Sequence, residues 1–288
     1  MANDSFRYRT FVEIGIIALV IYYLIGTPGL SSSSSANSTQ KDDNVPVARA
    51  KIESLVYPEK DLKCPDHSYK TIHIFSSSPL IIYIDGFLSP SEADHLINMS
   101  SQKWQTSTIF NAGHETTDNS IRKSEKALID RDATVQCIEA RALSFQGWPQ
   151  ETFIERLWTQ RYNTTGHYAH HYDWATASKT SRRASTFMVY LSAEADSEGG
   201  GTNFPRIAAP RDGRWCEIVE CASSGGGKGG VEGVTFKPRK GAAVFWQNFD
   251  AEGRGYRETI HAGMPVTRGT KVGLNIWSWY QAGHQVPI

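Results

Sequence analysis

The stretch from Tyr162 to Trp174 constrains the fold most, because this aromatic-rich, strand-like run contains a His-x-Asp pair, His171 and Asp173. Alternate residues of a β-strand point to the same face, so we expect this imidazole and this carboxylate to lie side by side. A metal site needs a further ligand, and the candidate is His261, which follows Asp173 by 88 residues (261 − 173). Two histidines and one carboxylate on one face of an octahedron are typical of non-haem Fe(II) oxygenases. The fold must therefore bring two distant segments together.

A set of ordered motifs accompanies this run. They are Arg183-Ala-Ser-Thr186-Phe-Met-Val-Tyr190-Leu-Ser192, Gly199-Gly-Gly-Thr202-Asn-Phe204-Pro205, Lys240-Gly241-Ala-Ala-Val-Phe245-Trp246, and Lys271 ten residues after His261 (271 − 261). In this order they resemble the prolyl 4-hydroxylase-type Fe(II)/2-oxoglutarate-dependent dioxygenases from about Pro79 to Tyr280. A lone His-x-Asp pair would be a weak signal, because such pairs also arise by chance.

The resemblance implies an activity and a set of cofactors. We expect hydroxylation of prolyl residues in peptides or proteins, with Fe(II), 2-oxoglutarate, O2 and L-ascorbate as cofactors and succinate and CO2 as co-products. His171, Asp173 and His261 are implied as the iron ligands. Two alternatives stay open: a hydroxylase of the same fold that acts on another residue or a small molecule, and a non-catalytic jelly-roll binding module.

The resemblance also implies how the co-substrate is bound. Lys271 is expected to hold the distal carboxylate of 2-oxoglutarate, with Tyr162 and Thr202 as hydroxyl partners. A buried, charged lysine without an anionic partner costs several kcal/mol, and the co-substrate would supply that partner. The alternatives are an exposed strand lysine and ordinary strand residues, since tyrosine and threonine are common in β-strands.

Three further residues match positions that lie on the substrate-binding side of the site in this family. Tyr168 is expected beside the metal, and Arg183 and Trp277 are expected to line the substrate-binding side, with a surface charge and a core tryptophan as their alternatives. The family usually has a histidine two residues after this tryptophan, where the chain has Trp279. This departure bears on the substrate rather than on the cofactor chemistry.

The two other histidines of the run are expected to be hydrogen-bonded or solvated. At strand spacing His170 points away from Asp173. His167 would share a face with His171 in an unbroken strand, yet at a distance from the metal pair.

Hydrophobic patterns predict an α+β fold. A strand is expected over 80–84, a helix after the capping box Ser89-Pro-Ser-Glu92, and a second helix over 132–145. From Glu155 onward short strands alternate with Gly, Asn and Ser. We therefore expect helices first, then a double-stranded β-helix of the jelly-roll or cupin kind that they support. The catalytic domain is placed at 51–288, with core motifs over 155–280. Equal numbers of acidic and basic residues, 30 each, predict no nucleic-acid partner.

The N-terminal residues predict a membrane anchor. Arg7 and Arg9 precede an apolar run over 14–25, which reaches the spanning length of about 20 residues when it is extended over 11–30. We expect a cytosolic tail and signal anchor over 1–30 and a Ser-rich linker over 31–50, with a cleaved signal peptide as the alternative. The expected location is the endoplasmic reticulum membrane with a lumenal catalytic domain, or secretion after cleavage.

Cysteines and glycosylation patterns fit that compartment. An even number of cysteines in an oxidising compartment favours disulfides. Cys216 and Cys221 are close enough in sequence to close a small loop; Cys64 with Cys137 is the remaining pair, with free thiols as its alternative. The acceptor patterns begin at Asn37, Asn98 and Asn163.

The segment 209–233 interrupts the strands with a glycine-rich run. A phosphate-binding loop needs Ser or Thr after its lysine, and Gly229 follows Lys228 here, so nucleotide binding is rejected. We expect an entrance loop or lid, joined at one end by a disulfide. A disulfide-isomerase-type partner is not expected, because no separate peptide-binding domain precedes the catalytic one.

Overall fold

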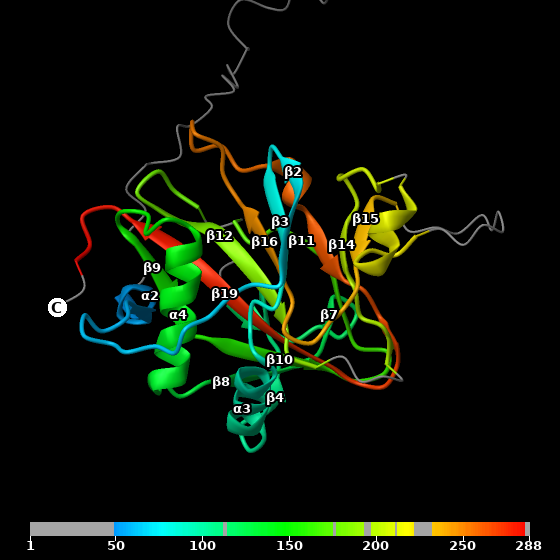
Figure 1. Ribbon diagram of the computed structural model, residues 1–288, viewed down its shortest axis with the longest axis horizontal. Coiled ribbons are helices and arrows are strands. Elements are labelled where there is room, and N and C mark those ends of the chain that lie inside the picture. Colours follow the sequence, from blue (N-terminus) through cyan, green and yellow to red (C-terminus); the bar gives the residue numbers. More distant parts are fainter. Residues whose placement is uncertain are drawn as a thin grey trace, which may run out of the picture. The chain divides into compact units, whose positions relative to one another are not determined.

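The structure is a computed structural model that describes residues 49–111, 114–174, 177–192, 197–210, 212–221 and 232–285 (Figure 1). Its α-helices are α2 (Arg49–Glu53), α3 (Pro90–Ser100) and α4 (Ala133–Phe145), and its 3-10 helices are η1 (Gly213–Glu217) and η2 (Arg257–Thr259). Its strands are β1 (Leu55–Val56), β2 (Thr71–Ser77), β3 (Leu80–Asp85), β4 (Gln105–Thr106), β5 (Ile109–Asn111), β6 (His114–Thr116), β7 (Arg122–Lys123), β8 (Glu125–Leu128), β9 (Thr152–Glu155), β10 (Trp158–Tyr162), β11 (His167–His171), β12 (Ser181–Tyr190), β13 (Glu198–Gly199), β14 (Thr202–Phe204), β15 (Val234–Phe236), β16 (Ala243–Gln247), β17 (His261–Gly263), β18 (Val266–Arg268) and β19 (Lys271–Gln281).

Two antiparallel sheets form the body of the domain. The ten-stranded sheet has the order β2-β3-β16-β12-β19-β10-β8-β4, with β9 and β1 attached beside β19. The five-stranded sheet has the order β15-β14-β17-β11-β7. The long strand β19 crosses the middle of the view in Figure 1, and the smaller sheet lies to its right. Two facing antiparallel sheets with mostly non-sequential neighbours are the arrangement of a jelly roll.

The two faces of the larger sheet pack into two separate cores. On β12, Phe187 and Val189 belong to the core that contains residues of α3 and α4. Their neighbours Met188 and Tyr190 belong to a core that the five-stranded sheet shares. This alternation follows from the period of two in a strand. The helices therefore cover one face of the larger sheet, and the smaller sheet covers part of the other face.

Local sequence signals locate the two long helices. Ser89 caps α3 and exchanges hydrogen bonds with Glu92, so the expected capping box is present. Asp132 caps α4, and Gly147 follows that helix at a φ of +77°, where glycine avoids steric strain. The predicted strand over 80–84 is β3. The expectation of helices first and strands after was wrong, because strands β1 to β8 come before and between α3 and α4.

Two disulfides join the predicted cysteine pairs. Cys64 bonds Cys137 of α4 across 73 residues, and Cys216 bonds Cys221 across 5 residues. The larger loop ties the segment before β2 to a helix of the main core. The smaller loop begins at Cys216 within η1, inside the interrupting segment 209–233.

Several predictions fall on residues outside the described ranges. These are the signal anchor over 1–30, nearly all of the linker over 31–50, the acceptor Asn37 and the glycine run at 225–230. Within the described ranges, no helix combines the length and the apolar character that crossing a membrane requires.

Candidate metal centre

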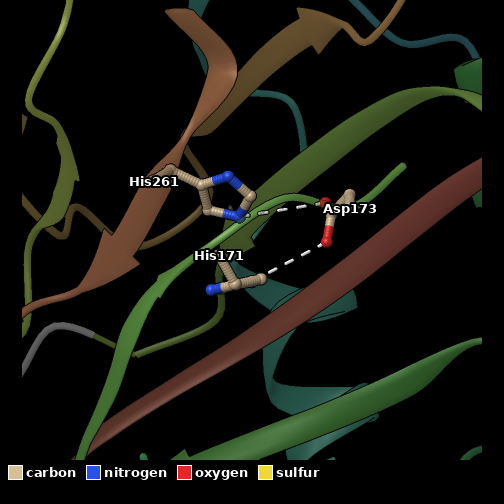
Figure 2. Close-up of side chains that lie close together, drawn as sticks. All are labelled: His171, Asp173 and His261. Carbon is tan, nitrogen blue, oxygen red and sulfur yellow. Dashed lines mark ion pairs between the residues drawn. The ribbon is translucent and has the colours of Figure 1, made fainter. Parts of the chain in front are cut away.

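Three side chains converge where two strands of the smaller sheet pair. His171 is the last residue of β11 and lies opposite His261, the first residue of β17. The Nε2 atoms of His171 and His261 lie 3.8 Å and 3.9 Å from the two carboxylate oxygens of Asp173, as Figure 2 shows. One potential ligand atom from each residue lies within 4.8 Å of the others. The three residues that the sequence predicted as metal ligands are therefore brought together.

The backbone reaches this arrangement in a different way from the one predicted. Asp173 is not on the strand with His171, because β11 ends at His171 and Asp173 occupies the turn that follows. The strand is also irregular: Tyr168 pairs with Gly263 and His171 with His261, so β11 has one extra residue between these pairs. This bulge turns Tyr168 to the face of His171, and their rings stack with centroids 3.7 Å apart. Residues three apart on a regular strand would point to opposite faces.

Each histidine is fixed by a backbone carbonyl. Nδ1 of His171 donates to the Ala169 carbonyl at 2.8 Å, and Nδ1 of His261 donates to the Thr259 carbonyl at 2.9 Å. A carbonyl oxygen can only accept, so these bonds put the ring hydrogen on Nδ1 and leave the Nε2 lone pair for a metal. Burial, together with the neighbouring His261, lowers the pKa of His171 well below its usual value. The ring is therefore neutral at neutral pH, which is the state that binds metal.

Asp173 is held as a carboxylate. Its Oδ2 accepts hydrogen bonds from the Thr186 hydroxyl at 2.8 Å and from the Trp277 indole N–H at 3.1 Å. Burial alone raises the pKa of Asp173, but His261, Arg183, His171 and the Thr186 bond outweigh burial and hold that pKa below its usual value. The site thus presents one carboxylate and two imidazoles with their Nε2 atoms available, a donor set that suits Fe(II).

Lys271 lies at the start of β19 with its side chain almost fully buried. Its Nζ lies 5.2 Å from the ring centroid of Tyr162 and 5.4 Å from that of Tyr190, and no described carboxylate forms an ion pair with it. Burial lowers the pKa of Lys271 to about 7. An isolated buried ammonium is unfavourable, so this position suits an anionic ligand. The buried state of this lysine excludes the alternative of an exposed strand residue.

A row of contacts leads from Lys271 toward the metal ligands. The Tyr190 hydroxyl donates to Thr202 Oγ1 at 2.8 Å. Thr202 pairs in turn with Gly263 of β17, two residues after His261. Tyr162 pairs directly with Lys271 in the larger sheet. The three residues predicted to bind the co-substrate therefore lie around one buried region between the sheets.

Arg183 and Trp277 contact Asp173, one of the candidate metal ligands. Arg183 forms a two-bond pair with Glu155, at 2.7 Å and 2.9 Å, and its Nη1 donates to the Asp173 carbonyl at 3.3 Å. Its guanidinium lies over the Trp277 ring, 3.9 Å from the centroid. Lys51 of α2 forms an ion pair with Glu155 on the other side. Both predicted substrate-side residues thus have contacts that position Asp173.

Trp279, which stands where the family usually has a histidine, is buried. Its ring packs in a cluster with Leu55 and Phe153, and the Lys51 Nζ lies 4.4 Å from the ring centroid. Residues of α2 and β1, which come before the matched motifs in the sequence, therefore cover this tryptophan.

The neighbouring histidines make ordinary hydrogen bonds. His170 is exposed and its Nε2 lies 2.9 Å from Asn203 Oδ1. His167 lies within 3.2 Å of the Ser120 carbonyl through its Nε2. Both contacts agree with the expectation of hydrogen-bonded histidines, although the strand between His167 and His171 is not the unbroken one assumed for their spacing.

Some residues of the site had no individual sequence signal. Thr186 and Trp277 face each other across β12 and β19, and this pairing places both beside Asp173. Glu155 lies at the end of β9, next to Arg183 only through the fold. Thr186 and Tyr190 stood within a recognised motif, so their spacing of four, which puts both on one strand face, was the available clue.

Comparison with known proteins agrees with this geometry. A sequence profile of the 2OG-Fe(II) oxygenase superfamily matches residues 157–279. Residues 157–279 thus resemble a 2OG-Fe(II) oxygenase domain. The superfamily uses Fe(II), 2-oxoglutarate and O2, and the donor set of this chain fits that metal.

The curated relatives of this chain share one activity in their names, that of a prolyl 4-hydroxylase. Prolyl 4-hydroxylase 1 of Arabidopsis thaliana is 29% identical over 213 residues, which cover 71% of this chain and 70% of that protein. Prolyl 4-hydroxylase subunit alpha-1 of Mus musculus is 28% identical over 210 residues, which cover 69% of this chain and 34% of that protein. A further Arabidopsis relative is covered over 63% of its length. The chain thus spans less than two thirds of the length of some relatives.

A solved structure resembles the fold of this chain. The viral collagen prolyl hydroxylase from Paramecium Bursaria Chlorella virus-1, in its 2OG complex, aligns with a TM-score of 0.50 and 26% identity. The alignment covers 69% of this chain and 95% of that one.

Proposed function

We propose that this chain hydroxylates prolyl residues in peptides or proteins, with Fe(II), 2-oxoglutarate and O2 as cofactors and L-ascorbate as the reductant that keeps the iron active. One observation carries the proposal: a His-Asp-His set with free Nε2 atoms shares one jelly roll with a buried lysine that forms no ion pair with a described carboxylate. A binding module would need neither the donor set nor the buried cation.

The bound iron and 2-oxoglutarate supply the oxidising chemistry, with succinate and CO2 as co-products. His171, Asp173 and His261 would hold the metal. Lys271 would neutralise the distal carboxylate of 2-oxoglutarate, and its buried position keeps water away from that end. Because Tyr190 donates to Thr202 Oγ1, the hydroxyl hydrogen of Thr202 is left to donate to the same carboxylate.

Tyr162 and Tyr168 complete this assignment. The Tyr162 ring lies against the Lys271 Nζ, so its hydroxyl is proposed as a further partner of the co-substrate. The Tyr168 ring stacks on His171 and receives the Arg122 guanidinium on its ring at 4.5 Å. Burial raises the pKa of Tyr168, so its phenol stays protonated and can donate a hydrogen bond beside the metal. We propose that this donor orients the substrate.

The prolyl substrate is supported by the names of the relatives. Trp279 supports the alternative of a non-prolyl target in the same site, because the fold buries it where the family usually has a histidine. We propose that the parts of the Arg183 and Trp277 side chains that do not contact Asp173 face the substrate.

The test incubates the purified protein with Fe(II), 2-oxoglutarate, ascorbate and a panel of proline-containing peptides. Mass spectrometry then looks for one added oxygen on proline, and succinate is measured in parallel. We expect both products, and neither from His171→Ala. Succinate without a modified proline would replace prolyl hydroxylation by the alternative target. Absence of both products from a protein that binds metal and 2-oxoglutarate would contradict catalysis.

We also propose that the catalytic domain works in the secretory lumen, attached through residues 1–30. Two disulfides among the described residues and the exposed acceptors Asn98 and Asn163 support an oxidising compartment. Expression in animal or plant cells, followed by treatment with a glycosidase and protease protection of microsomes, tests this proposal. A protein that protease digests in intact microsomes and that carries no glycan would contradict it.

A further inference from the structure

The indole of Trp174 joins the two chain segments that carry the metal ligands. Trp174 directly follows Asp173, and its Nε1–H donates to Thr259 Oγ1 at 3.1 Å and to the Tyr256 carbonyl at 3.3 Å. Thr259 is fully buried, and its own hydroxyl donates to the Tyr256 carbonyl at 2.8 Å. One indole hydrogen is thus shared by two acceptors at the two ends of the 3-10 turn η2, 82 and 85 residues further along the chain.

That turn fixes the second histidine. The carbonyl of Thr259 accepts the Nδ1–H of His261 at 2.9 Å, and this bond sets both the tautomer and the angle of the ring. Trp174 holds Thr259 from one side, and its backbone continues into Asp173 on the other. We propose that Trp174 is a positioning residue that fixes His261 relative to Asp173, and thereby sets the affinity of the site for its metal.

Gly255 lies against the Trp174 ring, where any larger residue would collide with the indole. A Cβ atom built on Gly255 would lie 2.7 Å from each of three indole carbons of Trp174. Gly255 does not have a positive φ, so its backbone conformation is open to other residues. The ring, rather than the backbone, therefore requires glycine at this position. Gly255 lies just before η2, in the segment that delivers Thr259 to His261.

A space-filling role for this tryptophan makes a different prediction from a positioning role. The ring also contacts Tyr172 and Phe249, with centroids 4.6 Å and 6.1 Å away. If these contacts alone mattered, Trp174→Phe would keep most of them and leave metal binding unchanged. If the N–H bonds matter, Trp174→Phe weakens metal binding without a comparable loss of stability.

The experiment measures Mn(II) binding by the full chain, because Mn(II) prefers the same class of site and does not oxidise readily. Trp174→Phe is compared with wild type and with Trp148→Phe, a matched control in the exposed loop after α4. We expect the Mn(II) Kd of Trp174→Phe to rise by about 10-fold, at the low end for outer-shell partners. Its 2-oxoglutarate affinity at saturating Mn(II) and its apo melting temperature should stay close to those of the control.

A double-mutant cycle keeps the inference testable if Trp174→Phe folds poorly. Gly255→Ala should weaken Mn(II) binding in the wild-type background, because the new methyl displaces the indole. In the Trp174→Ala background the same methyl meets open space, so Gly255→Ala should add little. Additive effects of the two substitutions, or a Trp174→Phe protein with an unchanged Kd, would overturn the positioning role.

The inference rests on the proposed metal site, and the two can fail separately. A wild-type chain that does not bind Mn(II) would remove the metal site itself. Wild-type binding with an identical Kd in folded Trp174→Phe would remove only the role of Trp174.

Discussion

Arg183 lies over the indole of Trp277, 3.9 Å from its ring centroid, and both side chains contact the same candidate metal ligand, Asp173. The indole N–H donates to the carboxylate, and the guanidinium donates to the backbone carbonyl of the same residue. A cation stacked on an aromatic ring restricts both groups. The orientation of Asp173 is thus set by the larger sheet, although Asp173 itself follows a strand of the smaller one.

Trp277→Phe should weaken metal binding and make it more sensitive to acid. The substitution keeps the ring beneath Arg183 but removes the N–H that bonds Asp173 Oδ2. The carboxylate then loses part of what holds its pKa down, so protonation competes with metal at a higher pH. Mn(II) titrations from about pH 5 to 8 should show a Kd raised by roughly 10-fold, with release of the metal beginning at higher pH.

Thr186→Val supplies the matched comparison, because Thr186 donates to the same oxygen from the facing strand. Thr186→Val should also make the release of metal begin at a higher pH than in wild type. A Trp277→Phe protein whose pH profile overlays that of wild type would show that the indole bond does not influence the carboxylate.

Lys271→Met should weaken the binding of 2-oxoglutarate and abolish the pH dependence of that binding. Burial lowers the pKa of Lys271 to about 7 in the free protein, and a bound dianion would raise that pKa again. Binding therefore takes up a proton above about pH 7, and wild-type affinity should fall as pH rises through that range. Isothermal titration of the Mn(II)-loaded protein should show a loss of about 10- to 100-fold in the variant, as expected for a charged hydrogen bond.

The same substitution should stabilise the protein without ligand. The pKa of Lys271 is lower in the folded than in the unfolded chain, so the unfolded chain binds more protons between about pH 7 and 10.5. The free energy of unfolding of wild type therefore rises with pH in this window, and Lys271→Met should lack that rise. Equal pH dependence of unfolding in both proteins would contradict a buried, unpaired lysine.

The candidate metal ligands could be predicted from the sequence because both their residue types and their spacing are distinctive. His171, Asp173, His261 and Lys271 occur in a fixed order within recognisable motifs, and the fold brings the three ligands together. The detailed route was not predictable. A bulge adds one residue to β11, and nothing in the local alternation of polar and apolar residues specifies where a strand becomes irregular.

The supporting residues depend on contacts between distant segments. Glu155 reaches Arg183 because β9 pairs with β19 and β19 pairs with β12. Lys51 in turn reaches Glu155 because α2 leads into β1, which pairs with β9. A sequence pattern reports the period within one element, whereas these partners come from separate elements. The same limit applies to the disulfides: cysteine number and compartment favoured two bonds, and only the fold shows that Cys64 reaches α4.

Removal of the Cys64–Cys137 disulfide should destabilise the protein more than removal of the Cys216–Cys221 disulfide. The first closes a loop of 73 residues and the second a loop of 5, and a longer loop restricts the unfolded chain more strongly. We expect the paired Cys→Ser variant of the long loop to lose about 2–5 kcal/mol, or roughly 5–15 °C in melting temperature. Thermal unfolding of both double variants tests this order, and a larger loss for the short loop would contradict it.

Lys51→Met should make the domain sensitive to acid at a higher pH than wild type. Burial raises the pKa of Glu155, but Arg183 and Lys51 together hold that pKa below its ordinary value. A carboxylate of this kind stabilises the fold above its unfolded pKa, and that stability is lost as pH falls through the folded pKa. Without Lys51 the folded pKa rises, so unfolding followed by circular dichroism should show a loss of about 2 kcal/mol near neutral pH and an earlier decline on acidification. Lys126→Met is the matched control, because its ammonium also lies over an indole, that of Trp158, and its carboxylate partner Glu115 is exposed and 3.8 Å away. Parallel pH curves for the two variants would show that Lys51 acts on Trp279 alone and not on Glu155.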